Sequence, residues 1–143
     1  PTIPDSTPTP VPPPTPEPTG SCDVPSVDFT SGGGSVLLNG EEFIIKGTSW
    51  FGFETDTHTL HGLWQNGLSI AEGLDFLVSN GFNAVRLPYA VDAVLSNPVV
   101  ADSELMMEPG LVGKTMLEIM DVVVAECAKR HLLVMFDNHR LKA

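Results

Sequence analysis

The chain has little basic charge and no long hydrophobic run. Its 143 residues include 7 Lys and Arg against 18 Asp and Glu, which gives a formal net charge of −11. Nucleic acids and anionic membranes are bound by basic patches, so this imbalance argues against both kinds of partner. No run reaches the roughly 18 apolar residues of a membrane-spanning helix. We therefore expect a soluble protein that acts on neutral material.

Cysteine is also scarce, because only Cys22 and Cys127 are present. They lie far apart, and their spacing matches no pattern of metal ligands. Cys127 falls on the face of an expected helix, where a small core residue is the simplest interpretation. A disulfide between the two is left open, since spacing alone does not establish the required geometry.

A start methionine is missing as well, and so is any segment beyond the last strand-like run. The chain begins at Pro1 and ends at Ala143, soon after the apolar run Leu132–Phe136. We therefore expect a piece of a longer protein. In such a piece, the lack of a signal peptide carries no information about secretion.

Proline and threonine, in contrast, dominate residues 1–22. Proline fixes φ and removes a backbone donor, so this segment favours extended polyproline II and cannot build a core. Threonine alternating with proline is typical of the O-glycosylated stalks of secreted modular proteins. We expect a disordered linker over 1–22 and a folded domain over 23–143, with a disordered tail of no function as the alternative to the linker.

The domain is expected to begin with a hairpin and a loop. Asn39-Gly40 separates the apolar runs Val36–Leu38 and Phe43–Ile45, and predicts a tight β-hairpin because both turn residues tolerate positive φ. A first main strand should follow, ending near Trp50. The polar and aromatic segment Phe51–Gly67 predicts a loop, where binding groups concentrate.

A helix is expected after this loop. Ser69 and Glu72 form a capping-box pattern, which predicts a helix from about Ile70 to Asn80. Its apolar stripe, at helical spacing, is Ile70, Leu74, Leu77 and Val78.

The stretch Gly81–Tyr89, GFNAVRLPY, organises the rest of the chain. Gly81 can take the left-handed conformation that ends a helix. The apolar residues that follow are too few for a helix and predict a buried strand, Ala84–Leu87, which Pro88 would stop. Arg86 interrupts that strand, and a buried arginine is costly unless a carboxylate or a ligand pairs with it.

A second helix and a third strand complete the pattern. The connection Tyr89–Gly113 is rich in turn residues and predicts a long irregular excursion of functional type. A helix is expected from about Lys114 to Arg130. The apolar run Leu132–Phe136 then indicates a strand covered on both faces. The buried helix face is expected to hold Met116, Met120, Val123, Val124 and Cys127, broadened by Leu117, Ile119 and Ala128.

The alternation of strands and helices predicts an α/β fold with a parallel sheet and right-handed crossovers. In such folds the carboxyl ends of the strands hold the site. Three strand ends meet there, and they carry the Trp50 segment, Arg86 and Asp137–Arg140.

Four motifs in order give the chain a family resemblance. They are WFGFET at Trp50–Thr55, HGLW at His61–Trp64, NAVRLPY at Asn83–Tyr89 and DNHR at Asp137–Arg140. From Val36 onward the chain resembles glycoside hydrolase family 5, the cellulase family. The resemblance implies a partial (β/α)8 TIM barrel, made of the first three strands, two helices and an N-terminal hairpin. Three strands cannot close a barrel, which needs about eight.

The resemblance also implies roles for single residues. Arg86 would lie beneath the nucleophilic glutamate and keep it ionised, since a cation favours the charged form of a nearby carboxylate. His139 would line the −1 sugar subsite. Trp64 would contribute to the sugar-binding cleft, and His61 would shape the loop or the cleft. A structural ion pair for Arg86 and a supporting place for His139 remain the alternatives.

The catalytic groups themselves are expected to be absent. Retaining glycosidases use two carboxyl groups, and the resemblance puts these glutamates at the fourth and seventh strands, beyond the C-terminus. Glu54, Asp56 and Asp92 are expected to be solvated loop or turn residues. No metal is expected, because His58 and His61 lack an evident third ligand.

The expected function is that of a secreted endo-β-1,4-glucanase that hydrolyses β-glucan without a cofactor, inactive as this piece alone. A carbohydrate-binding module joined through the linker is an expected partner. A non-catalytic carbohydrate-binding or wall-associated module and a truncated product without function are the alternatives.

Overall fold

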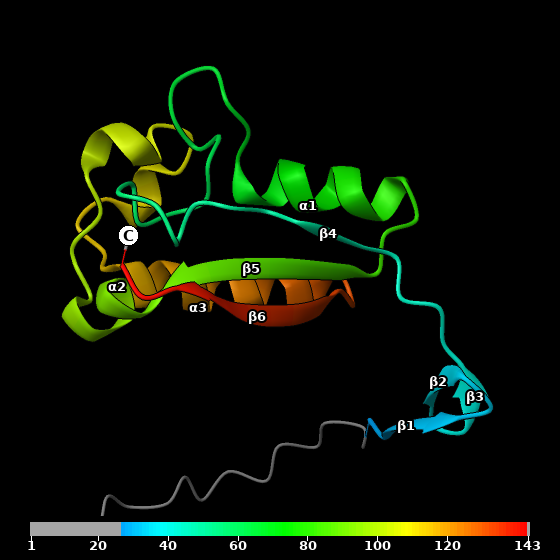
Figure 1. Ribbon diagram of the computed structural model, residues 1–143. Helices are drawn as coiled ribbons and strands as arrows, with labels where there is room; N and C mark the ends of the chain where they lie inside the picture. The colour runs from blue at the N-terminus through cyan, green and yellow to red at the C-terminus, as the bar shows by residue number, and fades with distance from the viewer. Residues whose placement is uncertain (1–26, 143) are drawn as a thin grey trace, which may run out of the picture. The chain divides into compact units, whose positions relative to one another are not determined.

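The computed structural model describes residues 27–142 and divides the chain into two compact units between Glu42 and Phe43 (Figure 1). The expected linker over 1–22 and Cys22 lie outside the described residues, so the linker and the disulfide stay predictions. Over residues 27–142, no helix combines the length and the apolar character that crossing a bilayer requires.

The N-terminal unit is a three-stranded antiparallel sheet in the order β1-β2-β3. Its strands are β1 (Phe29–Gly32), β2 (Ser35–Leu38) and β3 (Glu41–Glu42). The predicted turn between β2 and β3 is confirmed, with positive φ of 51° at Asn39 and 85° at Gly40.

The strands of this hairpin differ from the expectation. The strand predicted at Phe43–Ile45 is wrong, because the two-residue turn pairs the residues that flank it, Leu38 with Glu41. Strand β1, with the sequence FTSG, was not predicted because it lacks the apolar alternation that signals a strand.

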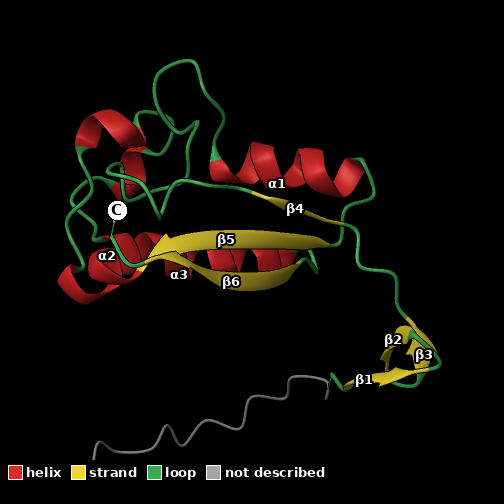
Figure 2. Ribbon diagram, viewed as in Figure 1, coloured by secondary structure: helices red, strands yellow, loops and turns green. Residues whose placement is uncertain are grey.

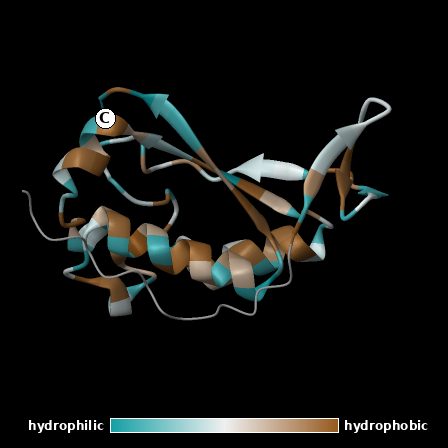
Figure 3. Cartoon of the chain, turned by 90° about the horizontal axis from the view of Figure 1, so that it is seen from below, coloured by the Kyte–Doolittle hydropathy of each residue, from teal (hydrophilic) through white to brown (hydrophobic). Residues whose placement is uncertain are grey.

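The second unit is built on a parallel sheet in the order β4-β5-β6, which confirms the predicted α/β fold. The strands are β4 (Gly47–Ser49), β5 (Ala84–Ala90) and β6 (Leu133–Arg140). Helices α1 (Ile70–Ser79) and α3 (Met116–Lys129) connect them and lie along one side of the strands (Figure 3). This repeated strand–helix connection is the building unit of a (β/α)8 barrel, of which the described residues hold three strands.

The connection between β5 and α3 is more ordered than the expected irregular excursion. It contains the short helix α2 (Val91–Ser96) and two 3₁₀ turns, η1 (Asp102–Leu105) and η2 (Pro109–Leu111). Each of these pieces is too short to show a helical period in the sequence. Each nevertheless packs one buried side chain into the core: Ala93 of α2, Leu105 of η1 and Leu111 of η2.

The ends of α1 follow from local sequence. The predicted capping box is present, because the hydroxyl of Ser69 accepts from the backbone N–H of Glu72 and the carboxylate of Glu72 accepts from the backbone N–H of Ser69. At the other end Gly81 has a φ of 74°, as predicted. Its N–H donates to the carbonyl of Val78, which satisfies one of the last helical acceptors. A second capping box, which the sequence reading did not identify, starts α3 at Thr115 and Glu118.

One hydrophobic core joins the helices to the sheet. The predicted helical faces are confirmed in most positions, but Val78 is 43% exposed and Ala128 is also exposed. Burial raises the pKa of the Cys127 thiol to about 11, so it stays protonated and inert at physiological pH. The fully buried side chains of the core include Phe53, Leu60, Leu63, Ile70, Leu74, Val85, Leu87, Met116, Ile119 and Val123.

Strand β5 runs through Pro88 to Ala90, so the expectation that Pro88 stops the strand is wrong. The backbone N–H of Trp50 donates to the carbonyl of Arg86, which therefore faces β4. Strand alternation puts the nitrogen of Pro88 on the same side, where β4 has already ended at Ser49. The missing donor consequently costs no ladder hydrogen bond.

The strand expected at Leu132–Phe136 is present as β6, but its expected cover on both faces is wrong. Met135 and Phe136 are 56% and 50% exposed, and strand alternation points them to opposite faces. β6 is the last strand of the described sheet, so no neighbour beyond it covers these side chains.

We predict that Gly73→Ala destabilises the protein, although alanine is the better helix former. A Cβ on Gly73 would overlap the outer edge of the six-membered ring of the Trp50 indole, which lies against this turn of α1. Overpacking of this kind costs about 1–3 kcal/mol, more than the gain of about 1 kcal/mol from helix propensity. Urea unfolding measures the difference. Gly110→Ala, where a Cβ meets nothing within 4 Å, is the matched control and should change little; an equal effect of both would contradict the proposed contact.

We also predict that the stability contributed by the two capping boxes is lost as the pH falls. Backbone and hydroxyl hydrogen bonds from Ser69 lower the pKa of Glu72, and those from Thr115 lower the pKa of Glu118, below the ordinary value of 4.5. A lowered pKa in the folded state gives stability that is present above the unfolded pKa and lost as the pH falls through the folded one.

The measurement is thermal unfolding at pH values from about 5 down to 3. Glu118→Gln keeps the geometry of the cap without the titrating group, so its melting temperature should fall less steeply than that of the parent. Glu41→Gln, on exposed β3, should follow the parent curve. Parallel curves for Glu118→Gln and the parent would be evidence against the linkage.

Candidate functional site

Polar side chains from three neighbouring strands lie on the face of the sheet away from the helices. The parallel register aligns Ser49 of β4 with Arg86 of β5 and Met135 of β6. Side chains two residues apart share a face, so Asp137 of β6 projects on the same side as Met135 and Arg86. The pairing with β5 is irregular at His139, and the contacts of its ring with Arg86 and Asp137 place it on the same side. The neighbours of Arg86, Val85 and Leu87, point into the helix-covered core instead.

Arg86 is held by contacts on both of its neighbouring strands. Its Nη1 donates to Oγ of Ser49 at 2.9 Å, and its Nη2 donates to Oδ2 of Asp137 at 2.5 Å. The same Nη2 lies 3.1 Å from Nδ1 of His139, which in turn lies 3.0 Å from Oδ2 of Asp137. The carboxylate partner that the sequence required for Arg86 is therefore Asp137.

A second cluster of aromatic rings forms in the loop after β4, drawn in green in Figure 2. The ring of His61 lies between Phe51, at 4.4 Å between centroids, and Trp64, at 5.3 Å and edge-on. Its Nε2 is 3.1 Å from the hydroxyl of Thr55, which donates to the carbonyl of Gly52. Trp64 is 41% exposed, so its indole, in contact with His61, presents a flat apolar surface to solvent.

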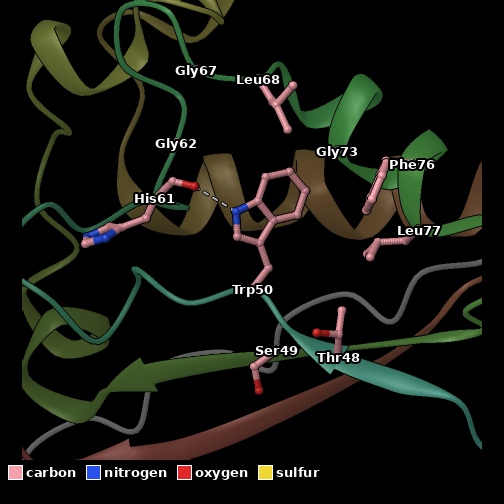
Figure 4. Close-up of a pocket in the computed structure, with 10 residues that line it drawn as sticks. All are labelled: Thr48, Ser49, Trp50, His61, Gly62, Gly67, Leu68, Gly73, Phe76 and Leu77. Carbon is pink, nitrogen blue, oxygen red and sulfur yellow. Dashed lines mark hydrogen bonds between the residues drawn. The ribbon is translucent and has the colours of Figure 1, made fainter. Parts of the chain in front are cut away.

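The end of β4 links the two clusters. Ser49 contacts Arg86, and the next residue, Trp50, donates from its indole to the carbonyl of His61 at 2.8 Å (Figure 4). The structure thus brings Arg86 together with His139, and His61 together with Trp64, whereas the connection between the pairs runs through Ser49 and Trp50. Trp50 itself is partly buried against the core.

A cavity of about 310 Å³ lies beside Trp50, between β4, the loop and α1 (Figure 4). Apolar side chains such as Leu68, Phe76 and Leu77 supply much of its wall. His61 borders it, but Arg86, His139 and Trp64 are not among its lining residues. It can hold apolar material and lacks a carboxylate or a guanidinium for acid–base chemistry.

The loop carboxylates have different environments. Glu54 is only 8% exposed, so the expectation of a solvated side chain is wrong: its Oε2 accepts from the backbone N–H of Gly52 at 2.7 Å. Asp56 is exposed, and Asp92 accepts from the N–H of Ala93 at 2.8 Å. Within residues 27–142 no group of three or more His, Cys, Asp or Glu side chains is arranged to hold a metal ion.

Sequence reading missed the parts played by Asp137, Ser49 and Thr55. Asp137 stood in the DNHR motif, but no contact was inferred for it. Its position two residues before His139 in a strand places both on one face, which is a signal that strand alternation alone supplies. Ser49 and Thr55 carry no such signal, because their contacts depend on strand register and loop conformation.

Comparisons with known proteins give consistent matches. The family profile described as Cellulase (glycosyl hydrolase family 5) matches residues 37–143. An endoglucanase of Paenibacillus polymyxa is 34% identical over 123 residues, which cover 84% of this chain and 30% of that protein. The major extracellular endoglucanase of Xanthomonas campestris pv. campestris is 36% identical over 104 residues, which cover 71% of this chain and 20% of that protein.

Solved structures agree with the sequence matches. An endocellulase of Pyrococcus horikoshii, in complex with cellotetraose, superposes with a TM-score of 0.71 at 29% identity, over 81% of this chain and 32% of that chain. The chain therefore spans less than a third of the length of each of these three relatives.

Proposed function

The chain belongs to the cellulase family, glycosyl hydrolase family 5, and from this premise we propose that the protein hydrolyses the O-glycosyl bonds of β-glucan as an endo-β-1,4-glucanase. One observation carries the proposal: Arg86 and His139 come together, with Ser49 and Asp137, on one face of three parallel strands. The carboxyl ends of parallel strands are where barrel enzymes keep their reacting groups. The endoglucanase relatives support the choice of reaction.

In this proposal the cluster around Arg86 serves the reaction, and the aromatic cluster binds the sugar chain. Arg86 supplies a fixed positive charge beneath the nucleophilic carboxylate and favours its ionised form. His139 contacts the sugar at the −1 subsite through its exposed ring. Trp64 offers its indole face to a sugar ring, and His61 supports Trp64 through an edge-on ring contact.

The reaction proceeds with retention of configuration, through two carboxyl groups about 5–5.5 Å apart. We place both of them outside residues 1–143. Two contacts support this choice: Asp137 is paired with Arg86, and Glu54 accepts from the N–H of Gly52, so neither of these carboxylates is free to act as a nucleophile. The proposed chemistry needs neither a metal nor an organic cofactor.

Secretion and a further module complete the proposal. A relative that is an extracellular endoglucanase supports secretion. The proline- and threonine-rich residues 1–22 favour a linker to a carbohydrate-binding module.

We predict that substitutions in the two clusters change different kinetic constants of the full-length protein expressed from its gene. Arg86→Lys should lower kcat by about 100-fold or more, because lysine cannot reproduce the two-sided guanidinium contacts. Trp64→Ala should raise KM about 10-fold with little change in kcat, because a stacking surface binds substrate and transition state alike. Initial rates on soluble β-glucan measure both.

Phe76→Ala is the matched control for Trp64→Ala, because Phe76 is an exposed aromatic side chain on α1 that lines the apolar cavity. It should leave KM unchanged. A rise in KM for Phe76→Ala and none for Trp64→Ala would assign sugar binding to the cavity. Binding of β-glucan by a parent protein that never cleaves it would favour the non-catalytic module instead.

We further predict that a polypeptide of residues 1–143 alone releases no reducing sugar from β-glucan, because both carboxyl groups are proposed to lie outside it. The assay compares this polypeptide with the full-length protein at equal concentration. Hydrolysis by the short polypeptide above a blank without protein would show that its own carboxylates suffice.

A further inference from the structure

We infer that Asp137 is a positioning residue, which fixes the guanidinium of Arg86 and holds the proton of neutral His139 on Nδ1. His139 then presents Nε2 as a hydrogen-bond acceptor for a sugar hydroxyl. The sugar as ligand rests on the proposed function, whereas the position of the proton rests on the contacts among Arg86, Asp137 and His139.

Three polar atoms form a closed triangle at the site. Its sides are 2.5 Å from Nη2 of Arg86 to Oδ2 of Asp137, 3.0 Å from Oδ2 to Nδ1 of His139, and 3.1 Å from Nδ1 to Nη2. A single ring nitrogen thus faces a strong donor and a strong acceptor at nearly equal distance. It satisfies only one of them, because Nδ1 carries either a proton or a lone pair.

Of the two contacts that Nδ1 of His139 makes, the one with the Arg86 donor is the weaker. The two hydrogens of a guanidinium NH₂ group diverge in its plane, and they cannot both aim at acceptors only 3.0 Å apart. The shorter contact, to the carboxylate of Asp137, takes one hydrogen and leaves the other badly directed toward Nδ1. Hydrogen bonds weaken steeply with such misalignment.

The acceptor side is favourable by contrast. A lone pair on Nδ1 would sit 3.0 Å from an anionic oxygen and be repelled, whereas an N–H there donates a charge-assisted hydrogen bond. A carboxylate oxygen accepts more than one donor, so Oδ2 of Asp137 serves Arg86 and His139 together. The balance of contacts therefore places the proton on Nδ1.

The position of the proton on Nδ1 decides whether Nε2 of His139 accepts or donates a hydrogen bond. Among the described residues the ring makes its hydrogen-bond contacts through Nδ1, and 49% of the side chain is exposed. With Nδ1 protonated, neutral His139 carries its lone pair on Nε2. Sugar hydroxyls donate well to such an acceptor, and a ring with the opposite tautomer would offer them a donor instead.

The same carboxylate restrains Arg86. Ser49 holds Nη1 from β4, and Asp137 holds Nη2 from β6, so the guanidinium is fixed across all three strands. A planar group held at two ends keeps its orientation better than one held at a single point. Loss of Asp137 would therefore free both neighbours at once.

The first test reads the tautomer directly. The full-length protein is labelled with ¹⁵N-histidine and studied by two-dimensional ¹H–¹⁵N NMR at a pH where the rings are neutral. His139→Gln identifies the signals of His139 by their loss. The parent should show the Nδ1–H form. Asp137→Asn should shift His139 toward the Nε2–H form, whereas Asp121→Asn, which removes an exposed carboxylate on α3, should leave the spectrum of His139 as in the parent.

Two results would overturn the inference. One is a neutral His139 that carries its proton on Nε2 in the parent protein, which needs no variant to fold. The other is a folded Asp137→Asn protein, verified by circular dichroism, in which His139 keeps the parent tautomer.

The second test reads the consequence in catalysis. Asp137→Asn should lower kcat/KM on soluble β-glucan by about 100-fold, the loss that a misplacement of about 1 Å at a reacting group can cause, and Asp121→Asn should not. An unchanged kcat/KM would refute the role in positioning. The NMR result needs no substrate, so a parent protein without hydrolytic activity would end the proposed function and leave the position of the proton to be decided independently.

Discussion

The arrangement of the second unit depends on the requirement that a charge within a sheet be paired. Arg86 lies in the central strand, between neighbours that point into the core, and its partly buried side chain loses hydration that a carboxylate partner offsets. Asp137 meets this need only if β6 is parallel to β5 and in the observed register, with Pro88 opposite Asp137. A slip of one residue would turn Asp137 to the other face and leave Arg86 unpaired. The ion pair therefore supports the register that also brings His139 to Arg86.

Local chemistry made part of the fold predictable from the sequence. The capping box at Ser69 and Glu72 and the left-handed Gly81 act within a few residues, so the limits of α1 were correct. The parallel order of the strands followed from their alternation with helices. The partner of Arg86 was required but not identified, because its identity depends on the register of a strand about fifty residues away.

Tertiary context accounts for what could not be predicted. The apolar run Phe43–Ile45 resembles a strand, but the Asn39-Gly40 turn selects the residues next to it for pairing. The segment Phe51–Gly67 has no helix or strand, yet it buries Phe53 and Leu60 completely. Its polar composition predicted a surface loop and gave no sign that its apolar residues complete the core. The same packing fixes the backbone that carries His61 and Trp64, so the loop is both part of the core and the support of the aromatic cluster.

Strand β6 has a consequence for handling the protein. Met135 and Phe136 expose apolar surface on opposite faces, and the outer edge of β6 has no partner strand within the described sheet. An edge of this kind offers free backbone donors and acceptors to any extended segment that approaches it. We expect copies of a polypeptide that leaves β6 in this state to self-associate through it at high concentration. The net charge of −11 opposes such aggregation through repulsion, so added salt, which screens charge, will promote it.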